Sequence, residues 1–170
     1  MNKETLLENF LLKLFRISAI KNYWDRNYKA LEFKNIPWTK LEKPLKECKI
    51  VLITTGGIHL KSDKEFDLSD PNGDCTSRRI PYDTNFKDLI ITHKYYDHHD
   101  AGRDPNLILP IEVLSELQSE GMLGPSCENH YSFMGHIEEP HLTKLIQKSS
   151  VEAAKEIRQQ KADIALLVPA

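Results

Sequence analysis

Apolar residues recur at helical spacing near the start of the chain, with polar residues between them. The apolar positions are Leu6, Leu7, Phe10, Leu11, Leu14 and Phe15. Thr5-x-x-Glu8 has the form of a capping box, in which two side chains satisfy the free backbone N–H groups of a first helical turn. The pattern therefore predicts a helix over about residues 5–20.

An aromatic flank and an extended connector follow this predicted helix. Tyr23, Trp24 and Tyr28 extend its apolar stripe, and Pro37 and Pro44 then lie among lysines. Proline favours extended backbone in the residue before it, so the connector should not be helical. We expect the stripe to pack on its own domain or on an identical subunit, the latter giving a homo-oligomer. The alternative is that it docks on a different partner.

Four later segments have the composition of strands. Residues 49–55 are a β-branched apolar run that Gly56-Gly57 ends, and shorter segments follow at 89–92, 126–134 and 163–168. An apolar run without polar alternation is typical of a strand buried on both faces, as in a parallel sheet. The first and the last of these segments are therefore predicted to be buried strands.

Helical patterns separate the strands. One helix should follow Pro110 and end at Gly121, and an amphipathic helix should open at Pro140. Their apolar positions are Ile111, Leu114 and Leu117 in the first, and Leu142, Leu145, Ile146, Ala153 and Ile157 in the second. Residues 61–88 are polar, and they are predicted to form a long loop that is a candidate lid.

The alternation of strands and helices predicts an α/β fold. We expect a mainly parallel three-layer sheet of the Rossmann or flavodoxin type over residues 48–170, with an N-terminal helical extension and connector over residues 1–47. The 170 residues suffice for one such domain, and 40% hydrophobic with 28% charged residues disfavours a disordered chain. The formal charge of −2 gives no basic excess for nucleic acid.

The cysteines and the apolar runs bear on the compartment. Cys48, Cys75 and Cys127 are an odd number without a CxxC pair, so a disulfide framework is disfavoured and a reducing cytosol fits best. No apolar run approaches the roughly 20 residues that span a bilayer. The N-terminus lacks the layout of a signal peptide, so a cytoplasmic protein without a membrane segment is expected.

Ligands of open α/β sheets bind beyond the carboxyl ends of the strands, so functional residues are expected directly after each predicted strand. After the first strand, residues 54–59 read Thr-Thr-Gly-Gly-Ile-His. Glycines let backbone amides approach an anion, yet neither a GxGxxG nor a P-loop spacing is present. A small carboxylate suits this turn better than a nucleotide, and a purely structural tight turn is the alternative.

The segment after the second strand, residues 92–100, is the richest in titratable side chains. His93, His98 and His99 lie there with two aspartates, which suggests a zinc, iron or manganese site. The spacing matches no known helical metal motif. His93 and His98 could instead act in acid–base chemistry or bind a carboxylate, and a solvated polar loop is a third interpretation.

The last two strand ends are also of interest. Residues 129–136 mix aromatic, sulfur and polar side chains, which suits a small pocket or simply a packed core. The final strand ends in Pro169-Ala170. Nothing distinguishes any cysteine as a nucleophile.

Together these segments resemble the glycine/sarcosine/betaine and D-proline reductase selenoprotein B family. The motifs that carry the resemblance are, in chain order, residues 53–61, 66–67, 79–81, 83–84, 91–93, 97–98, 106–110, 130–135 and 162–169. They span about residues 48–170, and residues 1–47 match less well.

The resemblance implies reductive cleavage of a carbon–nitrogen bond in a small amino acid or methylated amine. It places a selenocysteine or cysteine nucleophile directly after Ala170, so the native chain is expected to continue there, and the 170 residues alone should be inactive. A dithiol or a selenoprotein partner would resolve the adduct. The residues expected to line the pocket are Thr55, Gly56, His59, His93, Asp97, His98, Ser132, Met134 and Gly135.

Two alternatives of other classes remain. One is a metal-dependent hydrolase or lyase that holds zinc or iron on His93, His98 and His99. The other is a non-catalytic subunit that binds a partner through the helix and aromatic flank of residues 1–28.

Overall fold

The computed structural model describes residues 17–27 and 39–170, and the chain divides into two units at about residue 40. The first unit contains helix α2, Ser18–Asn27. The helix predicted over residues 5–20 lies mostly outside the described residues, as does most of the connector. The N-terminal extension therefore stays a prediction.

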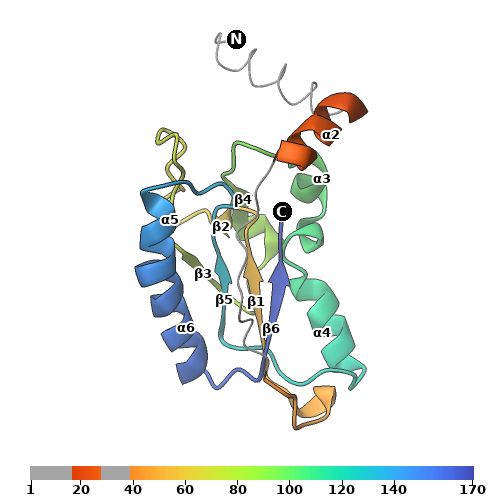
Figure 1. Ribbon diagram of the computed structural model, residues 1–170. Coiled ribbons are helices and arrows are strands. Elements are labelled where there is room, and N and C mark those ends of the chain that lie inside the picture. The colour runs from red at the N-terminus through yellow and green to blue at the C-terminus, as the bar shows by residue number, and fades with distance from the viewer. Residues whose placement is uncertain (1–16, 28–38) are drawn as a thin grey trace. The chain divides into compact units, whose positions relative to one another are not determined.

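The second unit contains six strands and four α-helices among its described residues (Figure 1). The strands are β1 Ile50–Thr54, β2 Ile58–Leu60, β3 Arg78–Pro81, β4 Leu89–Ile91, β5 Asn129–Ser132 and β6 Ile164–Val168. The helices are α3 His99–Arg103, α4 Ile111–Ser119, α5 His141–Lys144 and α6 Ser150–Gln159. A π-helical turn, Leu145–Ser149, joins α5 to α6, and short 3-10 turns cover Leu45–Glu47, Phe86–Asp88 and Pro105–Leu107.

The main sheet has the order β3-β5-β1-β6. β1 runs parallel to both β5 and β6, whereas β3 runs antiparallel to β5. β2 and β4 form a separate antiparallel pair. The predicted α/β class is confirmed, and the sheet is mixed. The Rossmann-like or flavodoxin-like arrangement stays a prediction.

One expectation about the middle of the chain was wrong, and one was confirmed. The segment 61–88 contains β3 and is not one long loop. Ile80 is the one buried residue of β3, and the strand is too short to give a clear period. The strand predicted at 89–92 is present as β4, and it lies outside the main sheet, because Ile58, His59 and Leu60 pair with Ile91, Ile90 and Leu89.

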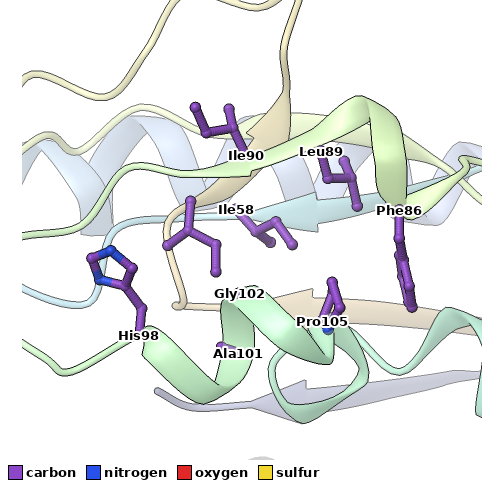
Figure 2. A pocket seen from close by; sticks show the side chains of 9 residues that line it. Ile58, Phe86, Leu89, Ile90, His98, Ala101, Gly102 and Pro105 are labelled. Carbon is purple, nitrogen blue, oxygen red and sulfur yellow. The ribbon is translucent and has the colours of Figure 1, made fainter.

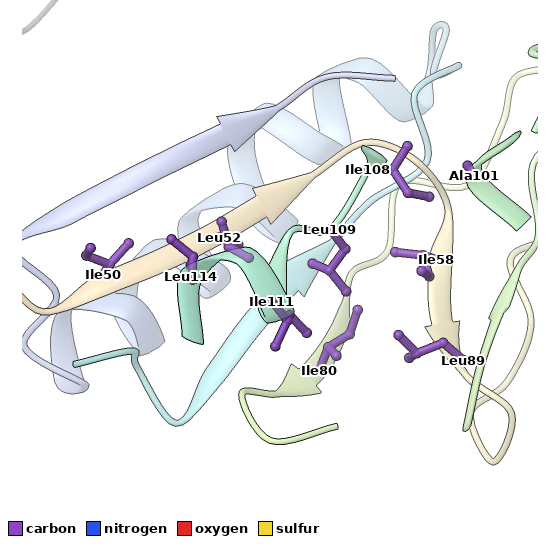
Figure 3. Close-up of a cluster of buried hydrophobic side chains, with 10 residues drawn as sticks. All are labelled: Ile50, Leu52, Ile58, Ile80, Leu89, Ala101, Ile108, Leu109, Ile111 and Leu114. Carbon is purple, nitrogen blue, oxygen red and sulfur yellow. The ribbon is translucent and has the colours of Figure 1, made fainter. Parts of the chain in front are cut away.

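The two faces of β1 pack against different helices, which lie on opposite sides of the sheet in Figure 1. Ile50 and Leu52 belong to a buried cluster with Ile111 and Leu114 of α4, drawn in Figure 3. Val51, which lies between them in the sequence, belongs to the other face of the strand and clusters with Ala153 of α6. This double coverage explains why β1 carries apolar residues without alternation.

Strand β6 was predicted to be buried, and the structure contradicts this. Leu166 is 43% and Leu167 67% exposed, and the strand is the last in the sheet order. Within the described part of the chain, β6 pairs only with β1. An apolar sequence alone does not distinguish a central strand from an edge strand.

Candidate functional site

The carboxyl ends of β1, β5 and β6 meet at one edge of the sheet (Figure 1). The backbone N–H of Ala170, after β6, donates to Thr55 Oγ1 at 3.0 Å. The N–H of Thr55 donates to the carbonyl of Val168 at 3.2 Å, and that of Gly57 donates to the carbonyl of Phe133 at 3.0 Å. Segments far apart in the sequence are thus joined where the strand-end argument placed the chemistry.

Gly135 permits a close approach of several segments at this edge. A Cβ atom there would lie 3.1 Å from the carbonyl oxygen of Ala170, 3.1 Å from His93 Nε2 and 3.2 Å from the carbonyl oxygen of Thr55. Such contacts are tighter than nearly all real Cβ contacts. The glycine therefore lets three backbone segments and one imidazole converge.

His93 lies in the centre of this convergence and is only 7% exposed. The backbone N–H of Tyr95 points at its Nδ1 at 3.1 Å, and that of Gly135 points at its Nε2 at 3.2 Å. If the ring were protonated, both of its nitrogens would carry a hydrogen, and each hydrogen would face a backbone N–H, that of Tyr95 or that of Gly135. Burial, followed by the charges of His98 and His136, lowers the pKa of His93 to about 4. The ring is therefore neutral near pH 7.

Tyr96 links His93 to His98. Its ring centroid lies 4.7 Å from that of His93 and 5.7 Å from that of His98, both in edge-on contacts. Its hydroxyl donates to the carbonyl of Gly56 at 2.9 Å. Burial raises the pKa of Tyr96 to about 12, so the hydroxyl stays a donor. Tyr96 thereby holds the segment after β4 against the turn after β1.

His98 lines a cavity of about 290 Å³ between the β2–β4 pair and α3 (Figure 2). The remaining lining residues are Ile58, Phe86, Leu89, Ile90, Ile91, Ala101, Gly102 and Pro105. The lining side chains are apolar apart from the imidazole of His98. The cavity could accommodate the apolar part of a small molecule.

Four predicted site residues lie apart from this convergence or face the core. His59 is fully buried, with its ring nitrogens 2.8 Å from the carbonyl of Leu60 and 2.9 Å from Thr92 Oγ1. Ser132 is buried and its hydroxyl has no hydrogen-bond partner among the described residues. Met134 is buried opposite Gly56, and Asp97 accepts from the backbone N–H of His99.

The three histidines of the metal alternative do not converge. His93 has backbone amides at both ring nitrogens, His98 lines the cavity, and His99 lies on the surface beside Asp100. In the described ranges, no group of three or more His, Cys, Asp or Glu residues could hold a metal ion.

Sequence reasoning overlooked the roles of Tyr95, Tyr96 and His136. The ring of Tyr95 lies 4.1 Å from that of His136, centroid to centroid, and His136 also helps to lower the pKa of His93. All three residues lie within the segments already singled out. Their aromatic character was the available signal, but their contacts depend on the fold.

The fold and this edge define an α/β protein with a candidate small-ligand site at the carboxyl ends of its parallel strands. Over residues 15–169 the chain matches the family model described as glycine/sarcosine/betaine reductase selenoprotein B. The chain belongs to this family, as the sequence motifs predicted.

Named relatives agree with this assignment. The chain is 32% identical over 130 residues to D-proline reductase subunit gamma of Acetoanaerobium sticklandii, covering 76% of this chain and 52% of the relative. It is 27% identical over 109 residues to sarcosine reductase complex component B subunit beta of Peptoclostridium acidaminophilum, covering 59% of this chain and 24% of the relative. It is also 27% identical over 118 residues to glycine reductase complex component B subunit gamma of Symbiobacterium thermophilum, covering 66% of this chain and 27% of the relative.

The chain thus spans about half the length of the first of these relatives and about a quarter of the other two. No solved structure gives a significant match. None of the helices in residues 17–27 and 39–170 is long and apolar enough to cross a membrane.

Proposed function

We propose that this chain forms the substrate-binding part of a reductase that cleaves the carbon–nitrogen bond of a small amino acid or methylated amine. Family membership supports the class of reaction, and the named relatives are subunits of reductases for D-proline, sarcosine and glycine. We extend the proposal to a three-layer flavodoxin-like sheet, a cytoplasmic location and a dithiol or selenoprotein redox partner.

One observation carries the proposal: Thr55, His93 and Gly135 converge on Ala170. A selenocysteine or cysteine joined to Ala170 would start from the edge where the three parallel strands end. We propose that this residue is the nucleophile. The rings of His93, Tyr96 and His98, together with the cavity that His98 lines, would then receive the substrate.

The arrangement around His93 suggests how an anion would be held. A neutral imidazole has one acceptor nitrogen, yet two backbone N–H groups point at this ring. One of the two amides is therefore not satisfied by His93. If the amide of Gly135 is the unsatisfied one, it can donate to a substrate carboxylate or to the selenolate.

The reaction balances with a dithiol as reductant. The selenolate or thiolate attacks the carbon of the C–N bond, and the amine leaves with a proton. A thiol then attacks the selenium or sulfur, and the carbon leaves with a proton. The second thiol displaces the nucleophile, so that the C–N bond becomes C–H while two thiols become one disulfide.

Ligand binding to the 170-residue protein tests the proposed site without requiring turnover. Glycine, sarcosine, betaine and D-proline would each be titrated by calorimetry. We expect one of them to bind, and Gly135→Ala to weaken its binding about tenfold, because the added methyl group meets Ala170, His93 and Thr55. Val113→Ala, an exposed change on α4, is the control. Binding of none of the four, or unchanged binding by Gly135→Ala, would contradict the proposed site.

A second experiment tests the nucleophile. The intact mass of the protein from its native host should show residues beyond Ala170, beginning with selenocysteine or cysteine. That longer protein should release amine, or open proline, when a dithiol is added. A native species that ends at Ala170 would remove the basis for the nucleophile, whatever the calorimetry shows.

A further inference from the structure

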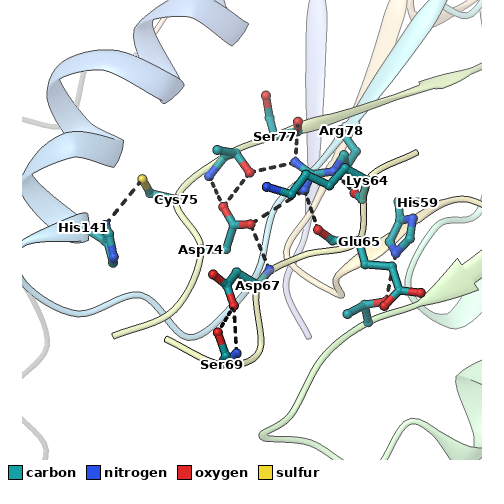
Figure 4. Close-up of polar contacts among 12 residues, drawn as sticks. His59, Lys64, Glu65, Asp67, Ser69, Asp74, Cys75, Ser77, Arg78 and His141 are labelled. Carbon is teal, nitrogen blue, oxygen red and sulfur yellow. Dashed lines mark hydrogen bonds and ion pairs between the residues drawn. The ribbon is translucent and has the colours of Figure 1, made fainter. Parts of the chain in front are cut away.

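A cysteine, a histidine and an aspartate come together outside the site described above, and Figure 4 shows the contact between the first two, Cys75 and His141. Cys75 and Asp70 lie between β2 and β3, and His141 is the first residue of α5. Cys75 Sγ lies 3.9 Å from His141 Nδ1, and His141 Nε2 lies 2.8 Å from Asp70 Oδ2. The imidazole is thus placed between a thiol and a carboxylate.

The two contacts determine which ring nitrogen carries the proton. The hydrogen bond with His141 is the main cause that lowers the pKa of Asp70, so this carboxyl is ionised near pH 7 and can only accept. Nε2 of His141 must therefore carry the hydrogen. In the tautomer that this contact selects, the lone pair is on Nδ1, which faces the thiol. This is the arrangement of a nucleophile, a base and a carboxylate that orients the base.

The segment that carries Asp70 and Cys75 is tied to the segment that carries His141. His136 Nε2 lies 3.1 Å from the carbonyl oxygen of Pro71, and the N–H of Glu138 donates to the carbonyl of Asn72 at 2.8 Å. At Gly73, φ is +84°, and a Cβ atom would collide with the carbonyl oxygen of His136. Backbone contacts therefore hold the three side chains in register.

The other two cysteines have different surroundings. The thiol of Cys48 faces the carbonyl oxygens of Pro44 at 3.3 Å and Lys43 at 3.7 Å, which cannot accept a proton permanently. Burial raises the pKa of the Cys127 thiol. Cys75 is the cysteine that faces an imidazole. It is 2% exposed, whereas the side chains of His141 and Asp70 are 24% and 34% exposed, so only a small reagent can approach.

We infer that Cys75, His141 and Asp70 form a thiol site that reacts with small disulfides, independently of the proposed reductase site. The thiol proton moves from Cys75 Sγ to His141 Nδ1, and the thiolate attacks one sulfur of the disulfide. The S–S bond of the reagent breaks as the bond to Cys75 forms. The departing thiolate takes the proton from His141. Cys75 is oxidised to a mixed disulfide, and half of the reagent is reduced to a thiol.

Thiol labelling of the 170-residue protein tests this inference, with two cysteines of the same chain as internal controls. Cystamine and iodoacetamide would be added separately at pH 7, and peptide mass spectrometry would follow each cysteine with time. We expect Cys75 to react about tenfold faster than Cys48 and Cys127 with either reagent. The three should react at similar rates in urea, where the fold no longer distinguishes them. Equal rates in the folded protein would overturn the inference.

Substitutions separate the role of the base from that of the local fold. His141→Gln should slow labelling of Cys75 about tenfold, and Asp70→Asn should slow it less, because the ring remains but loses its orientation. Lys144→Gln, an exposed change on the same helix α5, leaves His141 facing the thiol, so Cys75 should be labelled at the wild-type rate. Circular dichroism confirms that each variant is folded. If His141→Gln does not fold, the labelling rate of Cys75 in Asp70→Asn is used instead. Labelling of Cys75 at the wild-type rate in the variant that is used would overturn the inference.

Discussion

Strands β1 and β6 have similar apolar sequences and very different surroundings. In the parallel register, Ile53 of β1 lies beside Leu167 of β6, and Leu52 lies beside Leu166. Leu52 is fully buried, whereas Leu167 is 67% exposed. The difference arises because β1 has strands on both sides and helices over both faces, while β6 has one neighbouring strand in the described part of the chain. Burial here follows position in the sheet and not composition.

The two strands also contribute differently to the candidate site. β1 continues into Thr55 and Gly56, whose backbone is bonded to Val168 and Tyr96. β6 continues into Ala170, which is bonded to Thr55 by one hydrogen bond. The site therefore has one side that follows the well-packed strand β1 and another that follows the more exposed strand β6. The following predictions test this difference.

Among single substitutions, the largest difference should appear when a leucine on each strand is truncated. Leu52→Ala should lower the free energy of unfolding by about 3 kcal/mol, because it leaves a cavity in a packed core. Leu167→Ala should cost less than about 0.5 kcal/mol, since the side chain is already largely in water. Urea unfolding measures both. Similar losses for the two variants would mean that β6 is covered in solution.

Acid should destabilise the core around β1 next. His130 Nδ1 accepts from the N–H of Leu52 at 3.1 Å, and burial lowers the pKa of His130 to about 4, as it does for His93. Both histidines bind protons in the unfolded chain near pH 6.5. Stability should therefore be full above pH 6.5 and fall by about 1.4 kcal/mol per pH unit for each histidine down to about pH 4.

Urea unfolding between pH 7 and pH 4.5 checks this slope. His130→Asn keeps an acceptor for Leu52 but does not titrate, so it should show about half the slope. A wild-type stability that stays flat over this range would contradict the low pKa values.

A smaller effect is expected where the two strands meet. Thr55→Val removes the oxygen that accepts from the N–H of Ala170, so it should cost about 1 kcal/mol or less. The amide of Ala170 should exchange its hydrogen faster, as NMR can measure. Thr55→Ser retains the hydroxyl and should restore slow exchange. Unchanged exchange in Thr55→Val would show that this bond does not hold Ala170.

The smallest effect on stability should come from a charge on the exposed strand. Leu167→Lys should change the free energy of unfolding by less than about 0.5 kcal/mol. A lysine on an edge strand opposes pairing with another chain, so any self-association should decrease. Unfolding and light scattering measure the two effects. A loss of several kcal/mol would indicate that Leu167 is buried after all.

Much of the fold followed from the sequence. The apolar runs predicted β1, β4, β5 and β6, and the helical spacing predicted α4 and the α5–α6 segment. Strand β3 was missed because it has four residues and buries a single one of them, Ile80. The pairing of β2 with β4 was missed because three-residue strands leave no clear period.

The candidate site was predictable only in outline. Strand ends are recognisable from sequence, so Thr55, His93 and Gly135 could be singled out before their contacts were known. His59 was grouped with them because it follows the first strand closely, yet it lies in β2 and is buried. The contact between Cys75 and His141, 66 residues apart, could not be predicted at all.

The sequence by itself determined the α/β class, the family and the segments that carry the chemistry, because periodicity and ordered motifs are local properties of the chain. Only the tertiary structure decided that β1 is covered and β6 exposed, that His93 lies between two backbone amides, and that His141 faces a thiol. These features depend on contacts between distant residues, whose geometry no local pattern contains.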